Sequence, residues 1–271
     1  MTKLFNPALP RLLSAISAIS SVTSLSARAA PLRPLSTDRP DMTESPRTVD
    51  AGHFQIEMEV GSWEKNGAGS RWNFGEVTLK AGVATDTDLQ LVLPVYSRGR
   101  GGQEDGFGDI SLRLKHNLWG NEAGSTALAL LPWVSFPTGA DGTGSDGLGG
   151  GLLVPFAFEL GGEWTAGLMP GFEIAASETG NGADLILVQS VVFGHPVSRT
   201  AGVFVEGAGF WNVGSGSGHE AWLNAGFTWA PGSGKYQWDT GLRTGITRNS
   251  PDLMCEILTS NLGIPKIINL I

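Results

Sequence analysis

Hydrophobic and polar residues alternate along much of this chain, and the alternation first becomes regular within the stretch Thr37–Val60. The first half of this stretch is polar and contains Pro40 and Pro46, which excludes a helix or a central strand there. Because successive side chains of a strand point to opposite faces, the second half predicts a strand near 52–62 with one hydrophobic and one acidic face. The two faces are Phe54, Ile56, Met58 and Val60 against Gln55, Glu57 and Glu59.

The same period of two predicts ten further strands. A change of parity close to Gly75 predicts a β-bulge in the second strand. The clearest alternation sets Ile110, Leu112, Leu114 and His116 against Asp109, Ser111, Arg113, Lys115 and Asn117. The ten strands are expected at 72–83, 89–95, 109–119, 125–136, 151–160, 163–174, 183–194, 201–211, 219–230 and 235–247. An even-numbered barrel would need about twelve strands.

Alternation alone does not separate a membrane barrel from a soluble β-sandwich, because both have a hydrophobic and a polar face. The predicted connections favour the barrel, since short turns (84–87, 120–124, 161–163, 195–200 and 230–234) alternate with longer loops (62–70, 97–107, 137–150, 175–182 and 211–218). Tryptophans near strand ends are typical of interfacial girdles: Trp63, Trp72, Trp119, Trp164, Trp211, Trp229 and Trp238. We therefore predict an all-β fold, an antiparallel transmembrane β-barrel of about 12 strands. A secreted β-sandwich adhesin is the alternative.

The composition is consistent with an exported β protein, since 39 glycines among 271 residues disfavour long helices. Lys3 and Arg11 precede an apolar run, and Ala27-Arg28-Ala29 forms a small-x-small cleavage site, so 1–29 is predicted to be a signal peptide. That segment holds three basic residues and no acidic ones, so the remainder has 15 basic against 26 acidic residues. Such a balance disfavours nucleic-acid binding. The single cysteine, Cys255, rules out an intrachain disulfide.

Charged residues in the middle of barrel strands are expected to face inward, because a charge that faces lipid is costly near the midplane. The candidates for lining the lumen are Arg39, Glu57, Glu59, Arg113, Lys115, Glu206, Asp239 and Arg243. These side chains either line a conducting pore or form a salt-bridge network that fills a closed barrel. The segment 30–50 is expected to be a periplasmic extension or a partial plug that precedes a barrel at 51–253.

Several short motifs occur together over about 36–253. The most specific motif is Thr37-Asp38-Arg39-Pro40-Asp41, which is followed by Gly52-His53-Phe54-Gln55. The others are Phe107-Gly108-Asp109, Asn117-Leu118-Trp119-Gly120, Leu131-Pro132 and Pro137-Thr138-Gly139. Together they resemble an outer-membrane family of transporters named for the MetA pathway of phenol degradation. The resemblance implies a barrel in the outer membrane of a Gram-negative bacterium that passes small hydrophobic or aromatic compounds. It also implies outer-membrane lipids and the barrel-assembly machinery as partners.

The end of the chain departs from this resemblance. Barrels of this kind usually close with an alternating strand and a terminal aromatic residue, whereas 254–271 contains Pro265, lacks a clean alternation and ends in Ile271. We interpret 254–271 as an atypical tail, and we attribute it to a shift of reading frame just after Leu253. The hypothesis predicts that another frame of the coding DNA encodes an alternating segment that ends in Phe or Trp. It also predicts a poorly made closing strand with exposed neighbouring edges.

No catalytic or metal-binding constellation emerges from the sequence, so no enzyme activity and no cofactor are predicted. The glycine motif at Gly142–Gly147 lacks a following helix, so we interpret it as a flexible external loop. The histidines lack the spacing of a helical zinc motif: His53, His116, His195 and His219. A lipid-acting enzyme would need a serine near His219, where Ser215 and Ser217 are the local options. The predicted function is a passive pore or transporter, with a closed structural barrel or a lipid-acting enzyme as alternatives.

Overall fold

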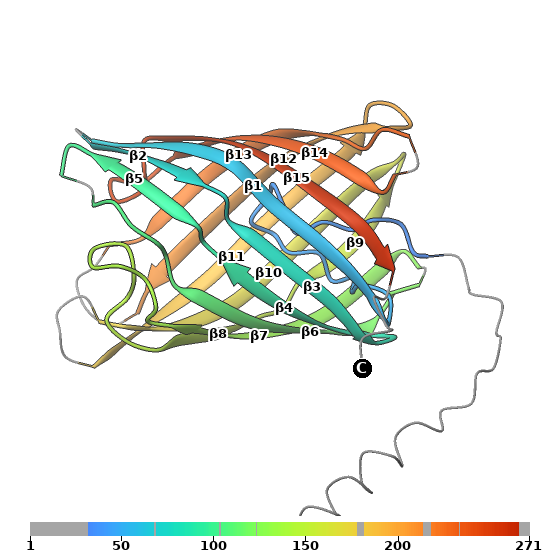
Figure 1. Ribbon diagram of the computed structural model, residues 1–271. Coiled ribbons are helices and arrows are strands. Elements are labelled where there is room, and N and C mark those ends of the chain that lie inside the picture. Colours follow the sequence, from blue (N-terminus) through green and yellow to red (C-terminus); the bar gives the residue numbers. More distant parts are fainter. Residues whose placement is uncertain are drawn as a thin grey trace, which may run out of the picture. The chain divides into compact units, whose positions relative to one another are not determined.

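A computed structural model of the chain describes residues 32–67, 69–102, 104–122, 124–177, 182–213, 218–232 and 234–265. Within them, fifteen strand segments form one antiparallel sheet that closes on itself as a barrel (Figure 1). The segments are β1 His53–Asn66, β2 Gly69–Phe74, β3 Val77–Ala84, β4 Thr87–Leu93, β5 Tyr96–Arg100, β6 Ile110–Trp119, β7 Thr126–Phe136, β8 Gly149–Leu153, β9 Phe156–Gly161, β10 Trp164–Ala176, β11 Ala183–Pro196, β12 Ala201–Asn212, β13 Glu220–Trp229, β14 Tyr236–Gly245 and β15 Leu253–Pro265. In these parts of the chain, no helix has the length and hydrophobicity needed to cross a membrane. The predicted signal peptide at 1–29 lies outside the described residues.

Three barrel strands are interrupted, so the fifteen described segments correspond to twelve barrel strands. β2 and β3 are successive parts of one barrel strand that is broken at Gly75, whose φ of 75° favours glycine. β4 and β5 are separated at Pro94, and β8 and β9 are separated at Pro155. Proline has no N–H to donate to a strand ladder, which explains both breaks. The predicted irregularity near Gly75 and the expected number of strands are confirmed.

The last described strand, β15, closes the barrel by pairing with β14 on one side and with β1 on the other. The prediction that the chain leaves both edges open after Leu253 is therefore wrong as far as residue 265. Alternation is present in β15, because Glu256 and Leu258 are buried while Ile257 is exposed. The alternation is not visible in the sequence, because the inward face includes the hydrophobic residue Leu258 and the outward face includes Cys255. The final residues of the predicted tail, 266–271, lie outside the described part.

The wall carries hydrophobic side chains outward and many polar side chains inward. On β1, Phe54 is 43% exposed, whereas Glu57 and Glu59 are 2% and 6% exposed. On β6, Leu112 is exposed and Lys115 is buried. A hydrophobic outer belt around a closed sheet is the surface that a membrane-spanning barrel presents to lipid. The predicted orientation of these two strands is confirmed, and the closed sheet excludes the β-sandwich.

The connections differ in length at the two ends of the barrel. At the turn end they are short, as at 85–86, 162–163 and 197–200, and at the loop end they include 101–109 and 137–148. Short connections face the periplasm in outer-membrane barrels. One predicted loop, at 62–70, is instead a hairpin. There β1 and β2 keep pairing up to Asn66 and Gly69, with Trp63 opposite Trp72.

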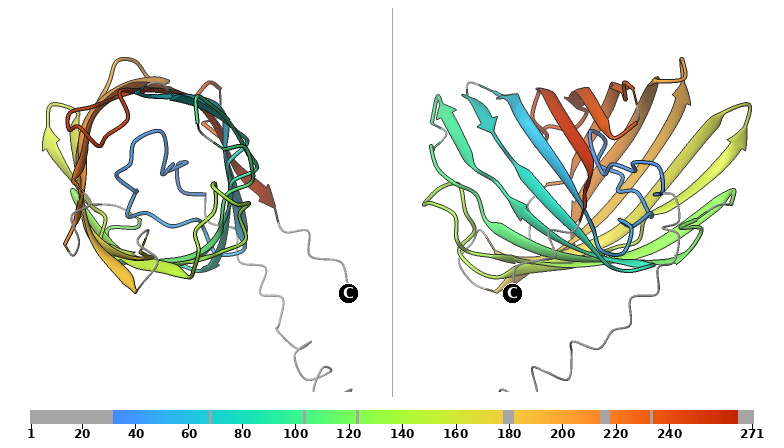
Figure 2. Two further views of the ribbon diagram at one scale, coloured as in Figure 1. Left: turned by 90° about the vertical axis from the view of Figure 1, so that its left-hand side faces the viewer. Right: turned by 45° about the vertical axis from the view of Figure 1, so that its right-hand side comes forward.

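The segment 33–50, which leads into β1, lies inside the barrel. Seen along the barrel axis, this blue stretch occupies the space within the ring of strands (Figure 2). It contains bends but no regular secondary structure, as expected for a segment interrupted by prolines. We call residues 36–49 the inner segment. Of the two positions considered from the sequence, this one corresponds to the partial plug.

Candidate permeation site inside the barrel

The inner segment is held by side chains that several barrel strands direct into the lumen. Because it forms no ladder of its own, its buried N–H and C=O groups need partners from the wall. Amide donors reach it from β1, β6 and β14: Gln55 to Ser36 O at 2.9 Å, Asn117 to Pro46 O at 2.8 Å and Gln237 to Thr37 Oγ1 at 3.0 Å. Its N–H groups also find acceptors on the wall. Thr48 N donates to Asn121 Oδ1 in the 120–125 turn and Val49 N donates to Asp88 Oδ2 of β4, both at 2.9 Å. Polar residues on the inner wall thus fix the position of this segment.

Asp38 lies between two buried lysines, Lys80 of β3 and Lys115 of β6. Lys115 Nζ is 2.5 Å from Asp38 Oδ1, and Lys80 contacts both Asp38 and Glu57. All four side chains are at most 5% exposed. Burial acts to raise the pKa of Asp38, but the positive charges of Lys115 and Lys80 outweigh it and hold that pKa below its usual range. This ion cluster anchors the first half of the inner segment.

Glu44 anchors the middle of the inner segment. One carboxylate oxygen accepts a hydrogen bond from Arg113 Nη1 at 2.7 Å, and the other lies 3.7 Å from Lys115 Nζ. Burial and the neighbouring charge of Asp38 nevertheless raise the pKa of Glu44 to about 7, against the opposing effect of Arg113 and Lys115. Glu44 therefore changes charge in the neutral pH range while it is docked.

Two further ion pairs balance charges elsewhere in the lumen. Arg39 of the inner segment pairs with Glu76, which lies between β2 and β3. Arg243 of β14 lies 3.4 Å from Glu256 of β15. In both cases a basic residue that faces inward meets an inward carboxylate. Both ion pairs lie inside the lumen.

Glu206 of β12 binds the inner segment at the point where that segment passes across β11–β13. Its carboxylate accepts hydrogen bonds from Met42 N at 2.9 Å and from Thr43 N and Oγ1, both at 2.7 Å. Asn224 of β13 donates to the same carboxylate at 3.1 Å, and Thr43 Oγ1 also lies 2.7 Å from Ser190 Oγ of β11. Several donors on one buried carboxylate make a strong, charge-assisted contact. We call Asp41–Thr43 the crossing, and it is fixed to the wall mainly at this carboxylate, with Ser190 as a further contact.

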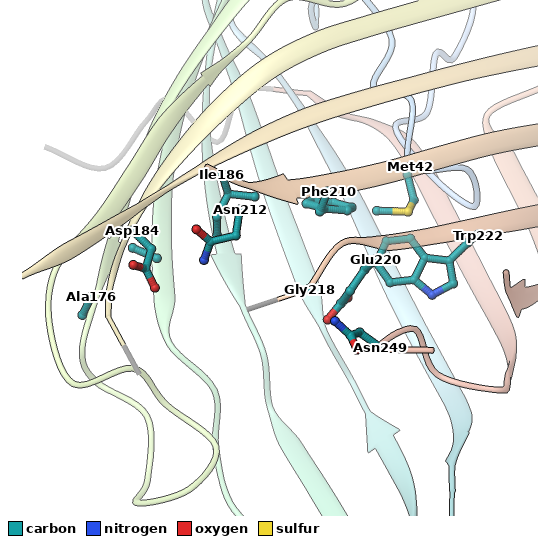
Figure 3. Close-up of a pocket in the computed structure, with 11 residues that line it drawn as sticks. Met42, Ala176, Asp184, Ile186, Phe210, Asn212, Gly218, Glu220, Trp222 and Asn249 are labelled. Carbon is teal, nitrogen blue, oxygen red and sulfur yellow. The ribbon is translucent and has the colours of Figure 1, made fainter. Parts of the chain in front are cut away.

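A cavity of about 640 Å³ lies on the loop-end side of the crossing. Figure 3 shows Met42 of the inner segment beside Phe210 and Trp222, which point into the cavity from β12 and β13. The two rings form an edge-to-face pair with centroids 5.3 Å apart. The other lining residues are Ala175, Ala176, Asp184, Ile186, Asn212, Gly218, Glu220 and Asn249. The cavity thus combines an aromatic floor with a polar rim.

A second cavity, of about 410 Å³, lies on the turn-end side of the crossing. Pro40 and Asp41 line it from the inner segment, and Val192, Phe204 and Thr228 are among the residues that line it from β11, β12 and β13. The same three strands therefore border a cavity at each end of the barrel.

The inner wall next to the loop-end cavity is hydrophobic rather than charged. Leu131, Leu153, Met169 and Val188 form a buried cluster on β7, β8, β10 and β11, and Phe210 packs against it. These residues face inward although they are apolar, so they break the simple rule that polar side chains face the lumen. The lumen has a charged side around Asp38 and a hydrophobic side around this cluster.

The eight residues predicted to line the lumen all lie in the inner segment or on the inner face of the wall. Beyond the contacts above, Asp239 is buried and accepts a hydrogen bond from Gln237 at 2.8 Å, and Glu59 is buried and accepts one from Ser62 at 2.9 Å. Lys80 also faces the lumen, although it was not among the residues predicted to do so. The signal was present, because this one charge alternates with outward hydrophobic residues of β3.

The family motifs are brought into contact at both ends of the barrel. The motif at 37–41 forms the first part of the inner segment, and Gln55 of the following motif donates to Ser36. His53 lies at the start of β1, with Nδ1 3.2 Å from Ala51 O, and Gly52 N–H donates to Gly82 O at 2.7 Å. The contact of Gln55 docks the inner segment against β1, and that of Gly52 joins the start of β1 to β3.

At the loop end, Asp109 joins two motifs that lie 30 residues apart in the chain. Its carboxylate accepts hydrogen bonds from Gly139 N at 2.8 Å and from Ser145 N at 2.7 Å. Burial acts to raise the pKa of Asp109, but the hydrogen bonds from Ser145 and its neighbours outweigh this effect and lower it. Asp109 thereby binds the loop at 137–148, which contains the glycine motif Gly142–Gly147.

Within the described ranges, no group of three or more His, Cys, Asp or Glu side chains could hold a metal ion. The ring of His195 is tilted by 57° against that of Trp164 with centroids 4.7 Å apart, and His116 Nδ1 lies 2.8 Å from Thr87 Oγ1. Ser215 and Ser217, the possible partners of His219 in a lipid-acting enzyme, lie outside the described residues.

The fold and the site define a class of protein: an outer-membrane β-barrel with a segment docked in its lumen. The chain belongs to the family described as "Putative MetA-pathway of phenol degradation", whose model matches residues 37–253. That assignment confirms the resemblance drawn from the sequence motifs.

Solved structures support the same fold. The COG4313 outer membrane channel from Pseudomonas putida F1 superimposes with a TM-score of 0.61 at 14% identity, over 81% of this chain and 98% of that one. The NanC porin superimposes with a TM-score of 0.56 at 6% identity, over 77% of this chain and 98% of that one. Curated protein sequences give no match. At these identities the comparisons establish the fold, which is that of outer-membrane barrels.

Proposed function

We propose that this protein is a passive channel of the Gram-negative outer membrane for small hydrophobic or aromatic compounds. The observation that carries the proposal is the loop-end cavity, with Met42, Phe210 and Trp222 at its floor. A cavity of about 150 Å³ holds benzene, so about 640 Å³ accommodates a substituted aromatic ring with space to spare. The hydrophobic wall beside it offers apolar contacts that a water-filled pore would lack.

The comparisons are consistent with this function. The family is named for phenol degradation, and the Pseudomonas putida neighbour is an outer membrane channel. The hydrophobic outer belt is the surface that we expect outer-membrane lipids to cover, and insertion by the barrel-assembly machinery follows from the same location. Diffusion down a gradient requires no cofactor or catalytic group.

A closed structural barrel is the second candidate, because the inner segment is bound to the wall on several sides. Planar-bilayer recording on the full-length protein separates the two. The channel predicts a measurable ionic conductance that added phenol reduces by occupying the loop-end cavity. A folded protein without any conductance would instead support the closed barrel.

Replacing Trp222 by alanine tests the site itself. Aromatic pairs contribute about 0.5–1.5 kcal/mol, so we expect the phenol concentration for half-maximal block to rise by up to about tenfold. Trp229→Ala is the matched control, because Trp229 lies on the same strand but faces outward with 46% exposure. Equal effects of the two substitutions would contradict binding at the loop-end cavity.

A further inference from the structure

The two cavities lie on the same three strands and are separated by the crossing. On the inner face of β12, Phe210 borders the loop-end cavity and Phe204 borders the turn-end cavity. Glu206 lies between them in the sequence and on the same face. In the crossing itself, Asp41 lines the turn-end cavity while the next residue, Met42, lines the loop-end cavity. Neighbouring residues thus face opposite cavities.

The neighbouring strands show the same division. On β11, Ile186 borders the loop-end cavity and Val192 the turn-end cavity, and Ser190 between them contacts Thr43. On β13, Asn224 is paired with Glu206 across the ladder and also donates to its carboxylate. The crossing therefore docks on one row of side chains, which runs across all three strands.

We propose that Glu206 is the latch of the channel: release of the crossing from Glu206 joins the two cavities into one path along β11–β13. This inference rests on the proposed channel function and names the residue that controls it. A solute that occupies the loop-end cavity touches Met42, the residue whose N–H group Glu206 holds. Binding in the cavity and release of the latch therefore act on the same residue.

The crossing is held by a different kind of contact from the rest of the inner segment. On either side of it, Asp38 and Glu44 are held by side chains of Lys80, Lys115 and Arg113. Among the described residues, the contacts of the crossing with Glu206 include no cation, and a second carboxyl group, that of Asp41, belongs to the crossing itself. Burial and the charge of Glu206 raise the pKa of Asp41 well above its usual value. Hydrogen bonds to Glu206 thus hold the crossing, whereas ion pairs hold its flanks.

The first test is Glu206→Gln in the full-length protein. The neutral amide loses charge-assisted hydrogen bonds to Met42 and Thr43, so we expect the open probability in planar bilayers to rise at least about tenfold. Glu173→Gln is the matched control, because it removes a partly buried carboxylate from the neighbouring strand β10. An open probability of Glu206→Gln equal to that of wild type and of the control would overturn the latch.

The second test locks the crossing covalently. Thr43 Oγ1 and Ser190 Oγ are 2.7 Å apart, a separation compatible with a disulfide between Thr43→Cys and Ser190→Cys. The pair is made in a Cys255→Ser background, since Cys255 is exposed. Oxidation joins the two thiols as an external oxidant such as diamide takes up the two electrons and two protons. We expect the conductance to disappear on oxidation and to return when a reductant cleaves the bond.

The outcomes separate the latch from the function on which it rests. If wild type conducts and the oxidised pair, with its disulfide confirmed by mass spectrometry, conducts equally well, the latch is refuted and the channel stands. If wild type, Glu206→Gln and the reduced pair all fold but none conducts, the channel function is refuted and the latch with it. Loss of conductance on oxidation, together with a higher open probability of Glu206→Gln, supports both.

Discussion

Replacing Asp38 by asparagine removes the carboxylate that two buried lysines share. The change is nearly isosteric, and an amide oxygen can still accept the hydrogen bond that Ser45 N now donates to Asp38 Oδ1 at 2.9 Å. Lys80 keeps Glu57 as a partner, and Lys115 keeps only Glu44, at 3.7 Å. The substitution therefore acts on the charge balance of the cluster and leaves its volume almost unchanged.

The expected loss is large because the charges are buried. Removing one partner from a buried ion pair costs about 3–5 kcal/mol. At about 1.4 kcal/mol for each factor of ten, the undocked fraction of the inner segment should rise by about two to four orders of magnitude. The exposed pair of Arg33 with Glu122 offers a contrast, since Glu122 is 68% exposed and such pairs contribute about 0–1 kcal/mol.

Trypsin cleavage after Arg47, followed by mass spectrometry on the detergent-folded protein, measures undocking, because cleavage requires the inner segment to leave the wall. When opening is fast relative to cleavage, the cleavage rate follows the open population. We expect Asp38→Asn to accelerate cleavage at least about a hundredfold and Glu122→Gln to leave it almost unchanged. Adding Lys115→Met to Asp38→Asn should slow cleavage again, because it removes the unpaired charge. Equal rates in wild type and Asp38→Asn would refute the view that this cluster anchors the inner segment.

Two further predictions concern pH and the closing strand. Burial and Asp38 raise the pKa of Glu44 to about 7 in the docked state. Docking is therefore most stable at a pH below the ordinary pKa of a carboxyl group, and it weakens as the pH rises through about 7. The open probability in planar bilayers should be higher at pH 8 than at about pH 5, and the reverse order would contradict this assignment. Asp38 shifts in the opposite direction, and its contribution is lost only in stronger acid. Truncation after Leu253 removes β15, the strand that pairs with both β14 and β1. Because the barrel then has two open edges, we expect no heat-modifiable folded band on gel electrophoresis. A folded band would show that β15 is dispensable for closure.

The alternation of side chains predicted most of the wall, because the period of two is a local property of a strand that faces lipid on one side and a filled lumen on the other. It placed Glu57, Glu59 and Lys115 inward and Phe54 outward, as observed. It did not detect β15, in which a buried Leu258 and an exposed Cys255 reverse the expected polarity. Hydrophobic residues on the inner wall, such as Leu131, were equally hidden, because their burial depends on what lies across the lumen.

By itself, the sequence determined the all-β barrel, the positions of all its strands except the closing one, the inward charges and the motif that begins at Thr37. Each of these follows from short-range patterns or from side-chain charge. Only the tertiary structure decided where the inner segment docks, because its partners lie far away in the chain: Lys115 is 77 residues from Asp38, and Glu206 is 163 residues from Thr43. Closure of the barrel brings these residues together. The inner segment is interrupted by prolines and forms no backbone hydrogen bonds with a neighbouring strand. Its N–H groups must therefore bind acceptors on the inner wall of the closed barrel, and this places the crossing between the two cavities.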